Sequence, residues 1–209
     1  SCVDNYPLSE VYLKVFRRAI KKKFTHVVLL DQDSLLSTYF SKKILADVNN
    51  SPFSVILPQV FVSDKLVSPA HNFLWFGWEL SKIDSVNLKY IFDVNSGVTI
   101  PCRYIDDFSF PVGLKNYGTD TYLFMFLRKC NAAFIINDNY IKHDLTFHKS
   151  NRDNTSYLRS YNEHMRAMRL IFKRNKCHRI LFSLYESIHR LKTAIFRRDI
   201  SFVKNICNK

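Results

Sequence analysis

The chain has 209 residues and a formal net charge of +13; 47% of its residues are hydrophobic, 15% are aromatic, and four are glycine. This composition excludes an intrinsically disordered protein, and the length suits one domain with a substantial core or a domain with an appendage. No apolar run approaches the roughly 18 to 20 residues that a membrane-spanning helix requires, so the sequence does not predict an integral membrane protein.

The positive charge is concentrated near the C-terminus. Residues 151–209 contain 14 Lys and Arg against 4 Asp and Glu, whereas residues 1–150 contain the other 17 against 14. This asymmetry indicates an anionic partner for the C-terminal segment, either lipid headgroups or nucleic acid. The five cysteines are widely spaced without a C-x-x-C pair. We therefore expect neither a disulfide framework nor a zinc site, and a reducing cytoplasm is the simplest location.

The first predicted elements are a helix over residues 9–23 and a strand over residues 27–30. Apolar residues at spacings of three and four mark one face of the helix, and the run V-V-L-L is typical of a buried central strand. Asp31 and Asp33 follow this strand, and side chains two residues apart point the same way in an extended chain. Two such carboxylates at the rim of a sheet suit Mg²⁺ or Mn²⁺. The simpler alternative is that Asp31 caps a turn and Asp33 is solvated.

The middle of the chain alternates helices and strands, which predicts a layered α/β fold. Residues 61–90 should be irregular. Their aromatic side chains, including Phe73 and Trp78, should serve mostly for core packing, and the alternative is that those at 73–78 stack on sugar faces. Pro58 should confine its strand to an edge or place it at a strand end, and Gly97 should break another. The expected elements are helices over 37–48 and 119–128 and strands over 54–60, 91–100, 134–136 and 140–141.

After about residue 155 the pattern changes to two amphipathic helices with basic outer faces. Their apolar residues recur at spacings of three and four, at Leu158, Tyr161, Met165, Met168 and Phe172, and at Leu181, Leu184, Ile188, Leu191 and Ile195. The predicted organisation is therefore a domain over residues 1–150 and a basic helical tail over residues 151–209. Two explanations remain for the tail: its apolar stripes pack on the domain, or its helices lie on an anionic membrane surface.

Four short motifs carry the candidate chemistry: D-Q-D-S at 31–34, N-S-G at 95–97, Y-G-T-D at 117–120 and H-D-L at 143–145. Each has a simpler explanation when taken singly, because Gly97 can allow a bulge, Asp120 can favour a helix start, and His143 can be a half-buried strand residue. In this order the set resembles family-2 glycosyltransferases of the GT-A fold. It is most similar to their rhamnosyltransferase-like branch, which typically writes its metal motif as D-Q-D-S. The resemblance covers roughly residues 5–150.

The resemblance implies inverting transfer of a sugar, with rhamnose favoured, from a nucleotide-diphosphate donor to a saccharide or lipid-linked acceptor. Asp31 and Asp33 would hold Mn²⁺ or Mg²⁺, with Asp33 as the direct ligand and His143 as a further one; imidazole favours Mn²⁺. The ion would neutralise the charge that grows on the leaving diphosphate. Asp120 would be the general base for the acceptor hydroxyl. The residues implied in donor and acceptor binding are Asp31, Gln32, Ser96, Gly97 and Thr119.

The family begins with a strand–helix–strand unit that grips the nucleotide, and roughly 80 to 100 residues of it would precede Ser1. Residues 1–150 should therefore form the C-terminal portion of a partial GT-A sheet, in the cytoplasm or on the inner face of the cell membrane. One alternative is an inactive remnant that binds membranes or partners through its basic helices. Another is a nucleic-acid-binding protein or metal-dependent nuclease. No nucleic-acid partner is expected, because no helix-turn-helix, zinc-finger or RNA-recognition signature occurs.

Overall fold

The computed structural model describes residues 6–31, 34–62, 65–80, 87–142, 153–173 and 176–204. The chain divides into two compact units: unit 1 comprises residues 1–110 and 119–146, and unit 2 comprises residues 111–118 and 147–209. The division falls near the predicted boundary at residue 150. The short segment 111–118, however, joins the C-terminal unit, which the sequence did not indicate.

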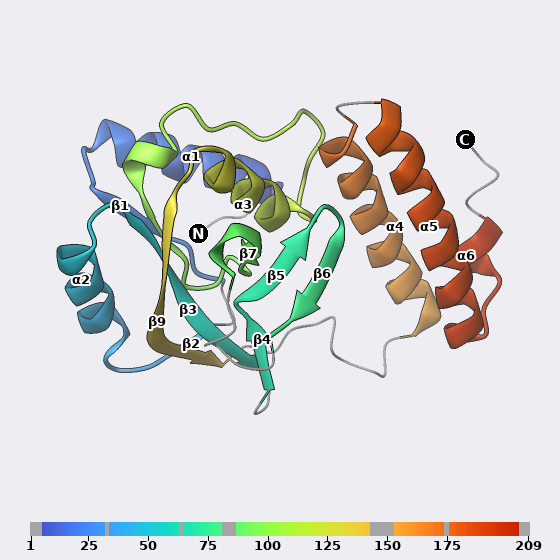
Figure 1. Cartoon of the computed structure of the whole chain (residues 1–209), viewed down its shortest axis with the longest axis horizontal. Helices are drawn as coiled ribbons and strands as arrows, with labels where there is room; N and C mark the ends of the chain where they lie inside the picture. The colour runs from blue at the N-terminus through green and yellow to red at the C-terminus, as the bar shows by residue number, and fades with distance from the viewer. Residues whose placement is uncertain are drawn as a thin grey trace. The chain divides into compact units, whose positions relative to one another are not determined.

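A mixed sheet of six strands lies at the centre of unit 1, which has the predicted α/β character (Figure 1). Five strands follow the order β1-β8-β3-β9-β2, and β4 pairs with β3. The pairing of β3 with β9 is parallel, and the other pairings are antiparallel. The strands are β1 (His26–Val28), β2 (Leu35–Leu36), β3 (Ser54–Val62), β4 (Lys65–Ser68), β8 (Thr99–Pro101) and β9 (Ala133–Lys142).

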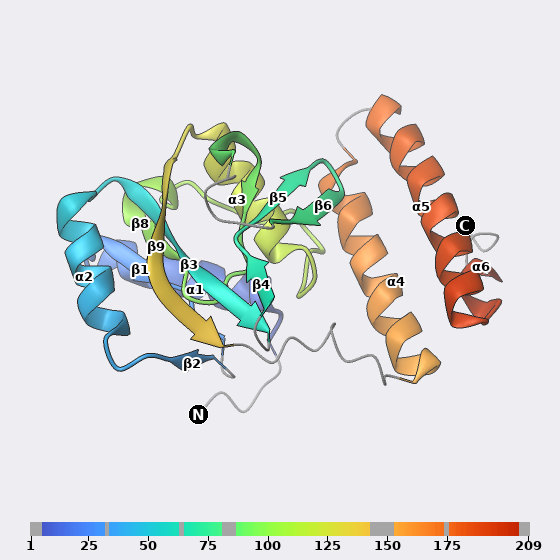
Figure 2. The same ribbon diagram turned by 60° about the horizontal axis from the view of Figure 1, so that its bottom comes forward.

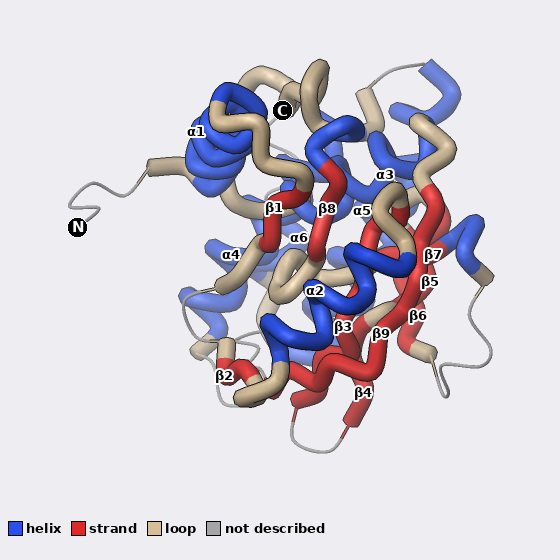
Figure 3. The backbone as a smooth tube through the Cα atoms, turned by 90° about the vertical axis from the view of Figure 1, so that its left-hand side faces the viewer, coloured by secondary structure: helices blue, strands red, loops and turns tan. Residues whose placement is uncertain are grey.

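Helices cover both faces of this sheet (Figure 3). On one face, Phe16 and Phe124 pack against the strands together with Leu57, in the larger core cluster. On the other face, Phe40 and Ile44 pack against β3 and β9. The predicted helices are confirmed as α1 (Leu8–Lys21), α2 (Phe40–Asn50) and α3 (Thr119–Lys129).

Two strand predictions were wrong in position. The run before Asp31 is not a central strand: β1 ends the strand order, and Val28 and Leu30 are exposed. A short apolar run occurs both in strands that are packed on one face of a sheet and in strands that are packed on both faces, so it did not reveal which kind this strand is. Conversely, β3 is central although it contains Pro58, because its pairing with β9 shifts register between Leu57 and Gln59 and so accommodates a residue without an N–H.

Residues 61–90 are not irregular as predicted, since they contain strands of two sheets. The hairpin β5 (Ala70–Phe73) and β6 (Phe76–Glu79) pairs with β7 (Ile91–Phe92) in a small antiparallel sheet. The hairpin turn places Leu74 at a φ of +55°, a conformation usually taken by Gly or Asn, so the sequence carries no turn signal here. The predicted strand over 91–100 is divided between β7 and β8, whereas the two short strands predicted at 134–141 are one strand, β9.

Unit 2 contains the two predicted helices, α4 (Asn154–Ile171) and α5 (Lys176–Arg197), followed by α6 (Ser201–Lys204) (Figure 2). A side-chain oxygen of Asp153 accepts the Ser156 amide at 3.0 Å and caps α4. The apolar stripe of α4 is buried, as its periodicity predicts. Within the part of the chain that the structure describes, no helix is long and apolar enough to cross a bilayer.

The segment 111–118 packs on α4 within unit 2. Leu114 is buried, and Gly118 has a φ of +76°. A Cβ added at Gly118 would lie 2.9 Å from both Met168 Cε and Ile171 Cδ1. Glycine is therefore required here for two reasons, the backbone conformation and the close approach of the helix.

Candidate active site

The first two motifs meet at the end of β1. The Leu29 amide donates to the Val98 carbonyl at 2.9 Å, and the Gly97 amide donates to the Leu29 carbonyl at 2.6 Å. The hydroxyls of Ser34 and Ser96 are hydrogen-bonded to each other. The D-Q-D-S and N-S-G segments are thus joined by backbone and side-chain bonds, although they are distant in sequence.

The Ser34 amide donates to the Asp31 carbonyl at 3.2 Å. Residues three apart make no such bond in an extended chain, so Asp31 and Ser34 do not belong to one continuous extended strand as the sequence predicted. The side chain of Asp31 is partly exposed. Gln32 and Asp33 lie outside the described residues, and so does His143.

Asp120 stands in the first turn of α3, as predicted, with a partly exposed side chain. The Thr121 amide donates to its Oδ1 at 2.7 Å. Burial of the carboxyl raises the pKa of Asp120, and the negative charge of Asp31 raises it further, against the opposing effect of backbone hydrogen bonds. A carboxylate with a raised pKa is a stronger proton acceptor than an ordinary one.

Tyr12 is a site residue that the sequence analysis assigned only to the core face of α1. Its side chain is buried, and its hydroxyl is hydrogen-bonded to the side chain of Asn95. Burial, followed by the charges of Asp31 and Asp120, raises the pKa of Tyr12, so its hydroxyl stays protonated. The charges of Asp31 and Asp120 thus both act on the phenol of Tyr12, and its protonated hydroxyl is a hydrogen-bond donor.

Asp93 is a second residue that the sequence analysis missed. It is fully buried beside β4: the Ser68 hydroxyl donates to its Oδ1, while its Oδ2 has no hydrogen-bond partner among the described residues. Burial raises the pKa of Asp93 well above its usual range, and the charge of Asp120 adds to this. Burial of this kind favours the neutral form of the carboxyl.

The other predicted contact residues lie below the surface. Ser96 and Thr119 are buried. Gly97 has a φ of +84°, and a Cβ there would meet the side chain of Ile141 and approach Pro58 Cγ to 2.8 Å. The need for glycine at this position is accounted for by packing inside the protein. Roles for these three residues in sugar binding stay predictions.

Exposed aromatic rings gather on the hairpin of the small sheet. Phe73, Phe76 and Trp78 are each about half exposed, although core packing was expected for most of this group. Trp78 meets the ring of His71 edge to face, with centroids 5.6 Å apart, and Phe73 meets Tyr90 at 5.8 Å. The rings are thus held in place while their faces remain accessible.

Asp31 is the predicted metal ligand that lies within the described residues. Asp31 supplies a hard oxygen donor of the kind that Mg²⁺ and Mn²⁺ bind, and the two other predicted ligands are outside the described residues. Among the residues that the structure describes, no group of three or more His, Cys, Asp and Glu side chains is arranged to hold a metal ion. The donor type fits a divalent cation, and the ligand set remains a prediction.

Comparison with known proteins adds no assignment to this geometry. No family model matches the chain, and no curated protein sequence matches it.

Proposed function

We propose that the chain is the catalytic part of a GT-A-type glycosyltransferase, which moves a sugar from a nucleotide-diphosphate donor to a saccharide or lipid-linked acceptor. The supporting observation is that the negative charge of one carboxylate acts on a second carboxylate from a distant motif. Asp31 follows β1, Asp120 lies in the first turn of α3, and the charge of Asp31 contributes to the raised pKa of Asp120. An inverting transferase needs this pair, one carboxylate for the donor side and one as a base.

In this mechanism Asp120 accepts the proton of the acceptor hydroxyl as its oxygen attacks the anomeric carbon. The bond from that carbon to the diphosphate breaks, and the diphosphate leaves with its electron pair. A divalent cation held by Asp31 and Asp33, with Asp33 as the direct predicted ligand and His143 as a further one, would neutralise the leaving group. Tyr12, which remains protonated, would be a hydrogen-bond donor in this site.

The exposed rings of the β5–β6 hairpin support a saccharide as the acceptor. Aromatic faces stack on the apolar faces of sugar rings. Phe73, Phe76 and Trp78 offer such faces on the small sheet, whose strand β7 is contacted by Arg128. The guanidinium of Arg128 donates to the Ile91 carbonyl at 3.0 Å and so ties the small sheet to α3. The hairpin and α3, which carries Asp120 in its first turn, are therefore held in one unit.

The decisive experiment compares Asp120→Asn with Asp107→Asn in the full-length protein. Asp107 is an exposed carboxylate in the same unit, so it controls for loss of one negative charge. With a panel of nucleotide-sugar donors that includes a rhamnose donor, we expect Asp120→Asn to lower turnover about 10²- to 10⁴-fold. Donor affinity should change little, and Asp107→Asn should behave as the parent protein.

The acid limb of the turnover–pH profile should also lie above the ordinary range of an aspartate pKa, because the pKa of Asp120 is raised by burial and by Asp31. A parallel loss of donor affinity in Asp120→Asn would make Asp120 a binding residue instead of a base. Absence of turnover with every donor would reject the transferase proposal and favour an inactive remnant.

A further inference from the structure

Helix α5 presents its apolar stripe to solvent. The sequence periodicity suggests that this stripe is the packed face, yet Leu184, Ile188 and Ile195 are 58%, 69% and 70% exposed. The buried side of the helix instead carries two charged residues, Glu186 at 3% and Arg190 at 2% exposure, together with Phe182 and Ala194. The full set of exposed apolar residues on and just after α5 is Ile180, Leu181, Leu184, Ile188, Leu191, Ile195, Phe196 and Ile200.

A buried ion-pair network fixes this orientation. The carboxylate of Glu186 accepts hydrogen bonds from Arg190 Nε at 2.8 Å and from Arg169 Nε at 2.7 Å. Arg190 also donates to Asn162 Oδ1 at 2.9 Å and to the Phe202 carbonyl at 3.2 Å. Turning α5 to bury its apolar stripe would break these bonds and leave charges uncompensated. The exposed stripe is therefore a consequence of the network.

The charges around the stripe have one sign. The exposed charged residues of α5 and the position after it are Lys176, Arg179, Lys192 and Arg198. Among the described residues of 176–204, the acidic side chains are Glu186, which is buried, and Asp199, which is half-buried and accepts the Ser201 amide at 2.9 Å. The surface is thus apolar and cationic, without an exposed carboxylate in the described part of this segment.

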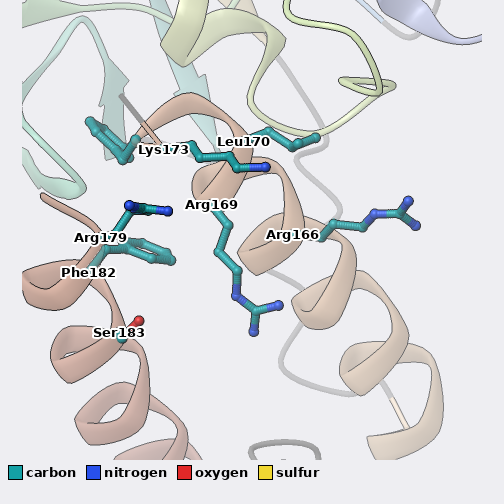
Figure 4. Close-up of a pocket in the computed structure, with 8 residues that line it drawn as sticks. Arg166, Arg169, Leu170, Lys173, Arg179, Phe182 and Ser183 are labelled. Carbon is teal, nitrogen blue, oxygen red and sulfur yellow. The ribbon is translucent and has the colours of Figure 1, made fainter. Parts of the chain in front are cut away.

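A cationic pocket lies beside the N-terminal end of the stripe. It has a volume of about 330 Å³ and is lined from α4 and α5 by basic and apolar side chains (Figure 4). Arg166, Lys173 and Arg179 are exposed cations of its wall, whereas Arg169 is paired with Glu186. Arg179 also lines a shallower depression that includes Ile180 and Leu184 of the stripe. The pocket and the stripe therefore form a continuous surface.

The combination of exposed apolar and cationic side chains indicates what binds to this surface of α5. A second copy of the chain would bring one cationic surface against another, although the stripe spacing of three and four would suit a paired helix. An anionic bilayer supplies both hydrocarbon for the stripe and phosphates for the cations. We propose that α5 lies in the interface of an anionic membrane, with its exposed apolar residues inserted and the Arg166–Lys173–Arg179 pocket receiving lipid phosphate. This proposal does not depend on the transferase proposal.

Vesicle flotation with the full-length protein tests the assignment. The test variant carries Ile188→Ser with Ile195→Ser, and the control carries Leu45→Ser with Val112→Ser, which are exposed apolar residues outside α5. The parent protein and the control should bind vesicles of phosphatidylglycerol and phosphatidylcholine, more weakly as salt is raised. The test variant should bind at least about tenfold more weakly. Arg179→Gln with Lys192→Gln should lower binding and reduce its dependence on salt.

Each other outcome overturns the proposal. Equal binding to vesicles of phosphatidylcholine alone would show that the cations are not used. A dimer in solution that Ile188→Ser with Ile195→Ser dissociates, without vesicle binding, would identify a second copy as the occupant. A large fall in melting temperature in the test variant but not in the control would show that the stripe packs within the protein.

Discussion

Replacing Glu186 with glutamine tests whether the buried network holds unit 2 together. Glutamine keeps the size of the side chain and removes the charge that faces Arg169 and Arg190. The Arg190 side chain is 3% exposed and cannot regain water, whereas that of Arg169 is 36% exposed and can. Removing one partner of a buried pair costs about 3 to 5 kcal/mol, and because one arginine is partly solvated we expect about 3 kcal/mol.

A loss of about 3 kcal/mol corresponds to a fall of roughly 6 to 12 °C in the melting temperature of a protein of this size. Calorimetry or far-ultraviolet circular dichroism would measure it. Glu163→Gln is the matched control, because Glu163 is on α4, is exposed, and is only 3.7 Å from Arg159 in a surface pair. Such pairs contribute little. If Glu186→Gln melted as Glu163→Gln does, the network would not be what orients α5.

The pH dependence of the same variant has a defined sign. Burial alone would raise the pKa of Glu186, but the hydrogen bonds from Arg169 and Arg190 lower it below its ordinary value of 4.5. A group whose pKa is lowered on folding stabilises the protein above its unfolded pKa, and this stabilisation is lost as the pH falls through the folded pKa. The difference in melting temperature between parent and Glu186→Gln should therefore narrow below about pH 4.5.

Two further predictions concern unit 1. Because Asp33 and His143 are predicted metal ligands, Asp33→Ala should abolish transfer in the full-length protein, and His143→Ala should raise the Mn²⁺ concentration needed for half-maximal rate. Undiminished activity of Asp33→Ala in a Mn²⁺ titration would show that Asp33 is not a ligand. Asp93→Asn should stabilise the protein increasingly as pH rises above the ordinary aspartate value of 3.8, since the raised pKa of Asp93 disfavours folding by about 1.4 kcal/mol for each pH unit up to its folded pKa. If the difference in melting temperature between the parent and Asp93→Asn stayed constant from about pH 5 to about pH 8, Asp93 would titrate alike in the folded and the unfolded protein.

Local periodicity predicted the helices well, because each carries its own pattern. The apolar positions of α1 and α4 identified both the helices and their buried faces. The same pattern failed for α5, where the helix was correct and the buried face was not. An acidic and a basic residue four positions apart, such as Glu186 and Arg190, normally form a surface pair. The sequence does not reveal that Arg169 of another helix completes a buried network.

Long-range pairing accounts for the other differences. The motifs of the candidate site were found because they are short and local, but the hydrogen bond between Tyr12 and Asn95 joins residues with no common pattern. Asp93 lies within the strand predicted over 91–100 and was not singled out, and only its complete burial beside Ser68 distinguishes it. The hairpin at 70–79 was missed because the turn at Leu74 lacks the usual residues.

Because segment 111–118 belongs to unit 2, removing the C-terminal helices would also affect this segment. A chain cut at residue 146 would lose α4, and with it the Met168 and Ile171 side chains that cover Gly118. Leu114, now buried, would face water. The helix α3 begins with Thr119 directly after this segment, and Asp120 follows, so the loop that leads to the proposed base would lose its packing partners. A shortened protein that ends at residue 146 would therefore be without part of unit 2 while keeping the segment 111–118 that packs in it.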